Sequence, residues 1–284
     1  MRRALPIPAI LVALSALLVC ASCNEQDVAK ATQGLPPADT TALAALNASP
    51  RHGEMVNVPL EGGPALRTWI VYPERKDKAG VVILIHEIFG LSDWMRGVAD
   101  RLAADGFIAV APDLITGLGP GGGGTESVSS RDSVVQLVRG LTPDETRRRL
   151  DAVRDWATAL PAANGKVATM GFCWGGARSF EFAAAEPPPA AAVVFYGSPP
   201  DSARLGDIDA LVLGHYGGDD ARITSTIEAT RGRLVALNQS YEPHVYAGAG
   251  HGFLRQQSGK DGANLKATQE SWPRTIAFLK QHLK

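Results

Sequence analysis

The stretch that decides the fold is Val167-Ala168-Thr169-Met170-Gly171-Phe172-Cys173-Trp174-Gly175-Gly176. It begins with a short apolar run, which is typical of a strand buried on both faces, and the residues that follow, 177–185, have helical spacing. A tight turn that brings a helix close to its strand needs glycine or another small residue beside it. The stretch therefore predicts a buried strand, a sharp turn with Cys173 at its tip, and a helix.

The same alternation continues on both sides of this stretch. Short apolar runs predict further buried strands at Val81–Ile85, Phe107–Val110, Ala192–Phe195 and Leu211–Leu213. Helical spacing is found at Trp94–Ala104, Asp144–Leu160, Ile223–Leu237 and in a last segment up to Leu283. An earlier hairpin is predicted at Met55–Leu60 and Leu66–Tyr72. Such alternation makes an α/β fold with a mostly parallel, doubly wound sheet and helices on both faces, in one domain over residues 54–284.

The first 53 residues differ from this pattern. Arg2 and Arg3 precede the apolar run 10–19, which is short for a membrane-spanning helix, so residues 1–23 are predicted to be an export signal. The end of this segment resembles a bacterial lipoprotein cleavage box with Cys23 as the acylated residue, although ordinary cleavage near Ala21 stays an alternative. We expect an exported protein that is periplasmic or membrane-anchored. Residues 24–53 are predicted to be a flexible tether.

Composition narrows the possible partners. The chain has 284 residues with 28 Lys+Arg and 29 Asp+Glu, a formal charge of −1, which excludes the basic excess that nucleic-acid binding requires. Its three cysteines are too few for a disulfide framework, and only Cys173 lies in the domain. The Gly-rich segment 112–130 lacks a phosphate-binding motif and is predicted to be a mobile surface loop that could border an active-site mouth.

Three residue types suited to nucleophilic catalysis follow predicted strands. Cys173 sits at the strand-to-helix turn, where the helix dipole favours a thiolate. An aspartate, Asp219 or Asp220, comes next, and His251 lies in Gly250-His251-Gly252-Phe253. The order nucleophile, acid, histidine is that of α/β-hydrolases, with Cys in place of the usual Ser. In such a set the histidine acts as general base and then acid, while the aspartate holds its tautomer.

Four motifs carry a resemblance to one family. They are His86-Glu87-Ile88-Phe89-Gly90, Ala111-Pro112-Asp113-Leu114, Gly171-Phe172-Cys173-Trp174-Gly175-Gly176 and Gly250-His251-Gly252-Phe253. With them, residues 54–284 resemble the dienelactone hydrolase family, whose members have the α/β-hydrolase fold. The resemblance implies Cys173 as nucleophile, His251 as base and Asp220 as acid. It also implies that Glu87 pairs with the Cys173 thiol and takes its proton when substrate binds. His86, next to Glu87, is predicted to be a structural core histidine rather than a second base.

The resemblance extends to groups that would bind the substrate. The backbone N–H groups of Ile88 and Trp174 match the family's oxyanion hole. Two arginines anchor a substrate carboxylate in the family, and Arg255 matches one by local spacing, whereas Arg131 matches the other only through an ungapped alignment. Gly252 stands where the family has Ser, so the pocket can differ. Another arginine run, Arg147-Arg148-Arg149, is predicted to be a solvated helix face.

These features predict an enzyme that hydrolyses a carboxylic ester or an enol-lactone through a Cys-His-Asp triad and an acyl-enzyme, without metal or organic cofactor. Two alternatives stay open. One is a general carboxylesterase or thioesterase with a different acyl specificity. The other is a non-catalytic envelope lipoprotein that binds a ligand in the same pocket. The expected partner in all three is a small molecule, with membrane contact only through a lipid at Cys23.

Overall fold

A computed structural model describes residues 30–284, which belong to two compact units, Met1–Leu35 and Pro36–Lys284. In the first unit, residues 30–32 are helical, and the Leu35 N–H donates a hydrogen bond to the Thr32 carbonyl at 3.0 Å. The export signal predicted for residues 1–23 and the acylation predicted for Cys23 lie outside the described residues and stay predictions. Within residues 30–284, no helix is long and apolar enough to cross a bilayer.

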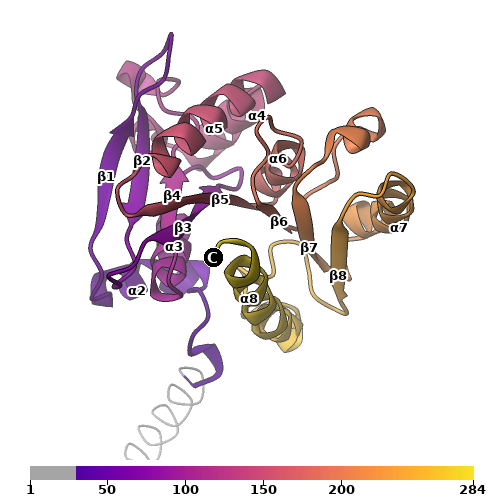
Figure 1. The fold of residues 1–284 in the computed structure, drawn as a ribbon. Coiled ribbons are helices and arrows are strands. Elements are labelled where there is room, and N and C mark those ends of the chain that lie inside the picture. Colours follow the sequence, from indigo (N-terminus) through magenta and orange to yellow (C-terminus); the bar gives the residue numbers. More distant parts are fainter. Residues whose placement is uncertain (1–29) are drawn as a thin grey trace, which may run out of the picture. The chain divides into compact units, whose positions relative to one another are not determined.

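The second unit is built on a sheet of eight strands in the order β1-β2-β4-β3-β5-β6-β7-β8 (Figure 1). The strands are β1 (Gly53–Val58), β2 (Leu66–Val71), β3 (Ala79–Ile85), β4 (Ile108–Pro112), β5 (Ala163–Phe172), β6 (Ala191–Phe195), β7 (Leu211–Gly217) and β8 (Tyr241–Tyr246). The pairs β1–β2 and β2–β4 are antiparallel and all other pairs are parallel. Every residue of β3 and β4 is buried, which explains their uninterrupted apolar sequences.

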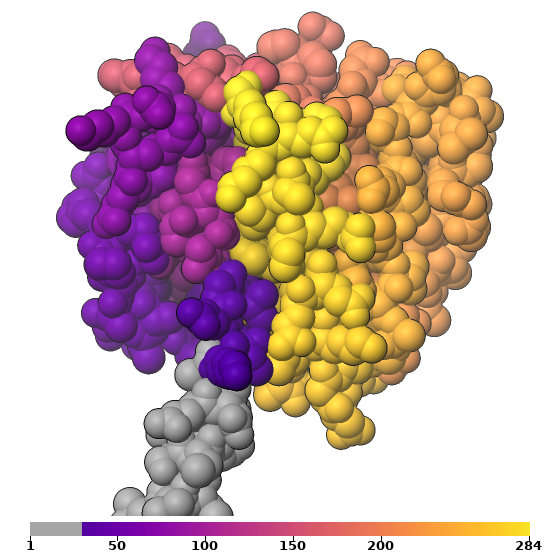
Figure 2. Space-filling view, turned by 60° about the horizontal axis from the view of Figure 1, so that its bottom comes forward, coloured from indigo at the N-terminus to yellow at the C-terminus, as the bar shows by residue number. Residues whose placement is uncertain are grey.

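Helices cover both faces of this sheet, as the α/β prediction requires (Figure 1). They are α2 (Ala42–Ala48), α3 (Asp93–Ala104), α4 (Arg131–Gly140), α5 (Pro143–Thr158), α6 (Trp174–Phe182), α7 (Ala221–Ala236) and α8 (Ala263–His282). One face carries α4, α5, α6 and α7, and the other carries α3 and α8. Figure 2 shows the C-terminal part of the chain, in yellow, between the indigo and purple N-terminal part and the orange part that precedes it in the sequence.

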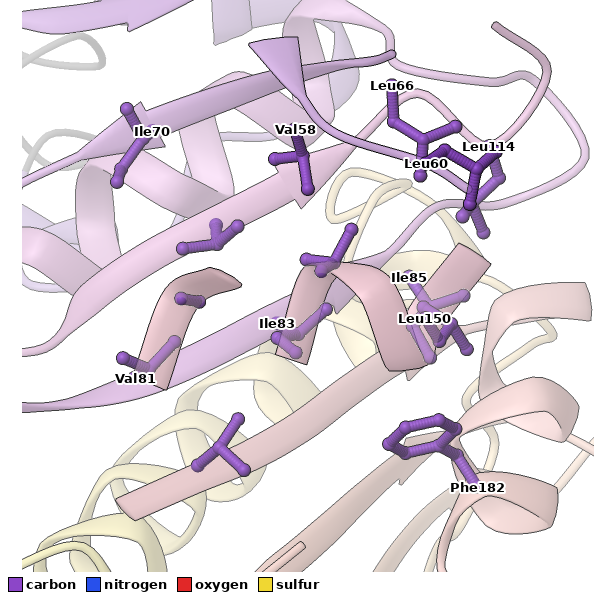
Figure 3. Close-up of a cluster of buried hydrophobic side chains, with 14 of the residues drawn as sticks. Val58, Leu60, Leu66, Ile70, Val81, Ile83, Ile85, Leu114, Leu150 and Phe182 are labelled. Carbon is purple, nitrogen blue, oxygen red and sulfur yellow. The ribbon is translucent and has the colours of Figure 1, made fainter. Parts of the chain in front are cut away.

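The larger hydrophobic core lies on the α5 face. Ile83 and Ile85 of β3 point toward Leu150 of α5, and Phe182 at the end of α6 closes the same cluster (Figure 3). Both isoleucines are fully buried, and burying such a side chain contributes about 1.5–3 kcal/mol. This packing holds the carboxyl ends of β3 and β5 in fixed positions, and the functional residues follow those ends.

Residues 36–53 differ from the predicted tether. They form the 3-10 turn η1 (Asp39–Thr41), helix α2 and the start of β1, and they belong to the same compact unit as the sheet. The Trp94 indole N–H donates to the Pro37 carbonyl at 3.0 Å, and Ala42 is buried. Helix α2 has only Ala42 and Leu46 turned inward, so its sequence shows no apolar periodicity. Its attachment depends on polar contacts that the sequence pattern does not reveal.

The Gly-rich segment 112–130 also differs from the predicted free surface loop. Both carboxylate oxygens of Asp113 accept hydrogen bonds from Thr125, from its N–H at 2.6 Å and from its hydroxyl at 2.8 Å. The Thr125 hydroxyl in turn accepts from the Leu91 N–H at 3.0 Å. These contacts tie the segment, which includes the 3-10 turns η2 (Pro120–Gly122) and η3 (Thr125–Ser127), to the ends of β3 and β4.

Helix α4 and one arginine of α5 also differ from what the sequence predicts. Helix α4 begins after the N-cap Ser130 and buries Val134 and Val138, and the spacing of these two residues is a helical signal that was missed in the sequence. Of the predicted solvated face, Arg149 is buried instead. It donates to the carbonyls of Leu114 and Thr116 at 3.0 and 2.8 Å, so it stabilises the loop after β4.

Candidate active site

Cys173 lies at the carboxyl end of β5, at the turn into α6, with a left-handed backbone (φ 55°, ψ −114°). A non-glycine residue rarely adopts this conformation, and surrounding contacts must stabilise it. The Cys173 N–H donates to the Phe195 carbonyl at 3.0 Å. At Gly171 any Cβ would overlap the carbonyl of Gly175, so the crossing of β5 and α6 is possible only because glycine is present. The predicted strand, sharp turn and helix are therefore present.

His251 and Asp220 meet at the ends of β7 and β8. Asp220 follows β7 and caps α7, and its Oδ2 lies 2.5 Å from His251 Nδ1. The Asp220 side chain is 8% exposed, whereas the His251 side chain is 32% exposed. Asp219 instead points to Lys260 at 3.1 Å on the surface. Of the two aspartates that the sequence offered, the structure places Asp220 against the histidine.

Glu87 follows β3 and is 3% exposed. Burial raises its pKa from the ordinary 4.5 to about 7, against the opposing effect of the Arg255 guanidinium. Arg255 Nε lies 2.7 Å from Glu87 Oε2, an ion pair in which the N–H is not directed at the oxygen. Because burial outweighs the guanidinium and the pKa lies near neutral pH, Glu87 can exchange a proton under ordinary conditions.

The sulfur of Cys173 is held as a thiol. Burial raises its pKa to about 11, and the charge of Glu87 adds to this increase, while a hydrogen bond from the Trp174 N–H opposes it. A thiol with this pKa is almost fully protonated at pH 7. The resting site thus holds an unreactive sulfur beside a carboxylate that has a raised pKa.

Two amide groups are predicted to form an oxyanion hole. The Trp174 N–H, at the first position of α6, is directed at the Cys173 sulfur. Ile88 follows Glu87 in the turn that the Gly90 N–H closes onto the Glu87 carbonyl at 3.3 Å. Among the described residues, no hydrogen-bond partner is found for the Ile88 N–H. Both amides can donate to a ligand.

The two predicted arginines converge on one aromatic ring. The guanidinium carbon of Arg131 lies 3.6 Å from the centre of the Phe89 ring, and that of Arg255 lies 5.1 Å from it. Both arginines line a cavity of about 320 Å³ together with Asp39. The structure therefore brings Arg131 to the same place as Arg255, although the two are far apart in the sequence. Cys173 and His251 are not among the residues that line this cavity.

Two residues of this region were not found from the sequence. Tyr196 follows β6, has φ 42°, and packs edge-to-face on His251 with ring centres 5.1 Å apart. The rule that functional residues follow buried strands applies to Tyr196 too and could have found it. Asp39 contacts Arg255 across 216 positions, and no local pattern predicts such a pair. His86 is structural as expected, since its Nδ1 lies 2.7 Å from the Glu87 carbonyl and its Nε2 accepts from the Leu114 N–H.

Comparison with known proteins agrees with this geometry. The profile of the "Dienelactone hydrolase family" matches residues 66–283. A Yersinia pestis protein named "Putative carboxymethylenebutenolidase" is 31% identical over 257 residues, 86% of this chain and 93% of its own length. "Carboxymethylenebutenolidase 1" of Cupriavidus pinatubonensis is 29% identical over 206 residues, 72% of this chain and 86% of its own length.

Solved structures give the same result. The crystal structure of a "Putative Dienelactone Hydrolase" from Klebsiella pneumoniae is similar with a TM-score of 0.72 and 28% identity, and the match covers 81% of this chain and 99% of that one. Among residues 30–284, no group of three His, Cys, Asp or Glu side chains could hold a metal ion. The chain belongs to the dienelactone hydrolase family, a family of hydrolases.

Proposed function

We propose that this protein hydrolyses a carboxylic ester or an enol-lactone through Cys173, His251 and Asp220, with a thioester acyl-enzyme as intermediate. The single observation that carries the proposal is the 2.5 Å contact between His251 Nδ1 and Asp220 Oδ2. It assigns the proton of the histidine to Nδ1 and leaves Nε2 as the basic atom. A half-exposed histidine in this state can take a proton from water.

The reaction begins with the thiol. Glu87, with a pKa of about 7, accepts the Cys173 proton when a substrate enters and the surroundings of both groups change. The thiolate attacks the carbonyl carbon, and the oxyanion accepts hydrogen bonds from the N–H groups of Ile88 and Trp174. The ester C–O bond then breaks, the leaving oxygen takes up the proton that Glu87 accepted, and the acyl group stays on sulfur as a thioester.

The second half uses water. His251 Nε2 removes a proton from a water molecule, which attacks the thioester carbonyl. The C–S bond breaks, a carboxylate is released, and the proton on His251 returns to sulfur. Asp220 stabilises the imidazolium that forms between these two steps. Each turnover consumes one ester bond and one water and restores the thiol.

A general carboxylesterase or thioesterase would use the same residues with a different acyl group. Gly252, which stands where the family has Ser, and Asp39, which lies before the part that matches the family, are the features of this chain that could change the acyl group. A protein that only binds a ligand would need neither the His251–Asp220 pair nor the strained backbone of Cys173. The geometry therefore favours catalysis over binding alone.

The test compares the wild type with Cys173→Ala on a dienelactone and on para-nitrophenyl acetate. We expect Cys173→Ala to lower kcat/KM by at least about a thousandfold because no other nucleophile takes its place. Rapid quenching followed by mass spectrometry should show the acyl group on Cys173 of the wild type. Near-UV circular dichroism of the variant checks its folding. Turnover that survives in the alanine variant would contradict the proposal.

A further inference from the structure

Asp39 holds the arginine that faces the cavity. Its Oδ2 lies 2.8 Å from Arg255 Nη1, and its backbone N–H donates to the Arg255 carbonyl at 2.9 Å. Arg255 is 11% exposed in its side chain and also pairs with Glu87, so two carboxylates share one guanidinium. Asp39 lies before residues 66–283, the part that matches the family.

The segment that carries Asp39 is fixed on both sides of the contact. The Trp94 indole N–H donates to the Pro37 carbonyl, and the Gln257 amide donates to the Pro36 carbonyl at 2.9 Å. Trp94 and Gln257 are both buried. Figure 2 shows this indigo segment against the yellow C-terminal part of the chain. Asp39 is therefore presented to Arg255 by an anchored backbone, although its side chain is 45% exposed.

The charges around the cavity show what Asp39 changes. Among residues 30–284, the charged side chains that line it are Arg131, Arg255 and Asp39, so this lining carries a formal charge of +1, and it would carry +2 without Asp39. No carboxylate pairs with Arg131 in the described part of the chain, where its guanidinium stacks on Phe89. A cavity of about 320 Å³ with two arginines can accept an anionic group.

We propose that Asp39 is a specificity-determining residue, whose carboxylate occupies the place at Arg255 that a carboxylate of the substrate would take. The protein then prefers esters or lactones that carry no negative charge on this side of the molecule. This inference rests on the proposed function and adds the class of substrate. A carboxylated substrate has to compete for Arg255 with the Asp39 carboxylate, which is covalently part of the chain. Of the two arginines in the cavity, only Arg131 is then left to bind the substrate carboxylate.

The experiment uses two matched esters, the para-nitrophenyl monoester of glutaric acid and para-nitrophenyl pentanoate, which differ in a terminal carboxylate against a methyl group. For each enzyme the readout is the ratio of kcat/KM for the charged ester to that for the neutral one. We expect Asp39→Asn to raise this ratio about fivefold to tenfold, through a lower KM for the charged ester, because Nη1 of Arg255 loses its carboxylate partner while Nε stays beside Glu87. The competitive inhibition constant of benzoate should fall by a similar factor.

Asp207→Asn is the matched control, because Asp207 also pairs with an arginine, Arg204, at 2.9 Å and is exposed, but it does not line the cavity. We expect its ratio to equal that of the wild type. The double variant Asp39→Asn/Arg255→Gln tests whether the effect acts through Arg255. Its ratio should equal that of the single variant Arg255→Gln, because Asp39→Asn has no effect once the arginine is absent.

The two proposals fail in different ways. An unchanged ratio and an unchanged benzoate constant in Asp39→Asn, with turnover that still needs Cys173, would overturn the role of Asp39 alone. Loss of the dependence on Cys173 would overturn the proposed function instead. If Asp39→Asn folds poorly, Asp39→Glu provides a second variant, in which a carboxylate of different reach should change the ratio less than Asn does.

Discussion

Two histidines near the end of β7, His215 and His251, lie in different surroundings that suit one to the fold and the other to the proposed reaction. His215 lies inside the sheet and is fully buried, with Nδ1 2.8 Å from the Tyr246 hydroxyl and Nε2 2.9 Å from the Thr275 hydroxyl. His251 lies in the loop after β8, where Asp220 holds Nδ1 and the ring is 32% exposed. Both have a well-defined orientation, but only His251 has a carboxylate partner.

The difference is one of charge and access. Burial lowers the pKa of His215 well below its ordinary value, so this ring stays neutral and joins three elements by hydrogen bonds. In the proposed function, Asp220 stabilises the imidazolium of His251, and the second nitrogen of His251 is left for a substrate or water. A histidine whose two ring nitrogens both have hydrogen-bond partners thus stabilises the fold. A histidine with one nitrogen left unpaired can transfer a proton.

The same substitution at both histidines gives the largest effect. We expect His251→Gln to lower kcat/KM by at least about a thousandfold because the general base is lost, with little change in the melting temperature. His215→Gln should instead cost about 1–3 kcal/mol in the free energy of unfolding, because buried hydroxyls lose their partners, and keep kcat/KM within about threefold. Urea unfolding and steady-state kinetics measure both. A His215 variant that folds normally and is inactive would break the comparison.

The carboxylate partner can be tested with two neighbouring aspartates. Asp220→Asn should lower kcat/KM by about a hundredfold to a thousandfold, since the amide does not stabilise an imidazolium and can favour the wrong tautomer. Asp219→Asn is the matched control, because Asp219 pairs with Lys260 on the surface, and its kcat/KM should stay within about twofold of the wild type. Equal effects at both positions would show that the Asp220 contact has no role in the reaction.

Glu87 gives the smallest and most pH-dependent effect. Its pKa in the folded protein is about 7 against an ordinary 4.5, so the folded state binds its proton more tightly than the unfolded state. Stability from this group is therefore present below pH 4.5 and lost as the pH rises to about 7. We expect Glu87→Gln to be more stable relative to wild type at pH 8 than at pH 4.5, by about 2–3 kcal/mol. Urea unfolding at both pH values measures this, and a difference that does not change with pH would contradict the buried acid.

Much of the fold was predictable because buried parallel strands have a distinct sequence. The runs at Val81–Ile85 and Ala192–Phe195 lie within β3 and β6, and the cysteine between glycines gave the turn between β5 and α6. Helix α2 was not predicted, because it buries only one side chain completely and so lacks an apolar stripe. Helix α4 was missed although Val134, Leu137 and Val138 recur at helical spacing and pack on the core.

The site was predictable where its residues follow strands and where the family motifs are local. Cys173, Glu87 and His251 lie in such places. The pairing of Asp39 with Arg255 joins residues 216 positions apart, and the burial of Arg149 depends on carbonyls of the loop after β4. These are tertiary contacts between polar groups, and a periodicity of apolar residues contains no information about them.

The backbone crossing beneath Cys173 has a consequence for how this protein can change. A methyl group on Gly171 would overlap the main chain of Gly175, and one on Gly176 would overlap the Phe195 carbonyl. In both cases the neighbouring atoms belong to the main chain. Main-chain atoms cannot rotate aside as a side chain can. The position of the Cys173 sulfur is thus fixed by main-chain packing, and laboratory evolution toward new substrates should spare the two glycines and diversify side chains that line the neighbouring cavity, such as Thr125 and Val128.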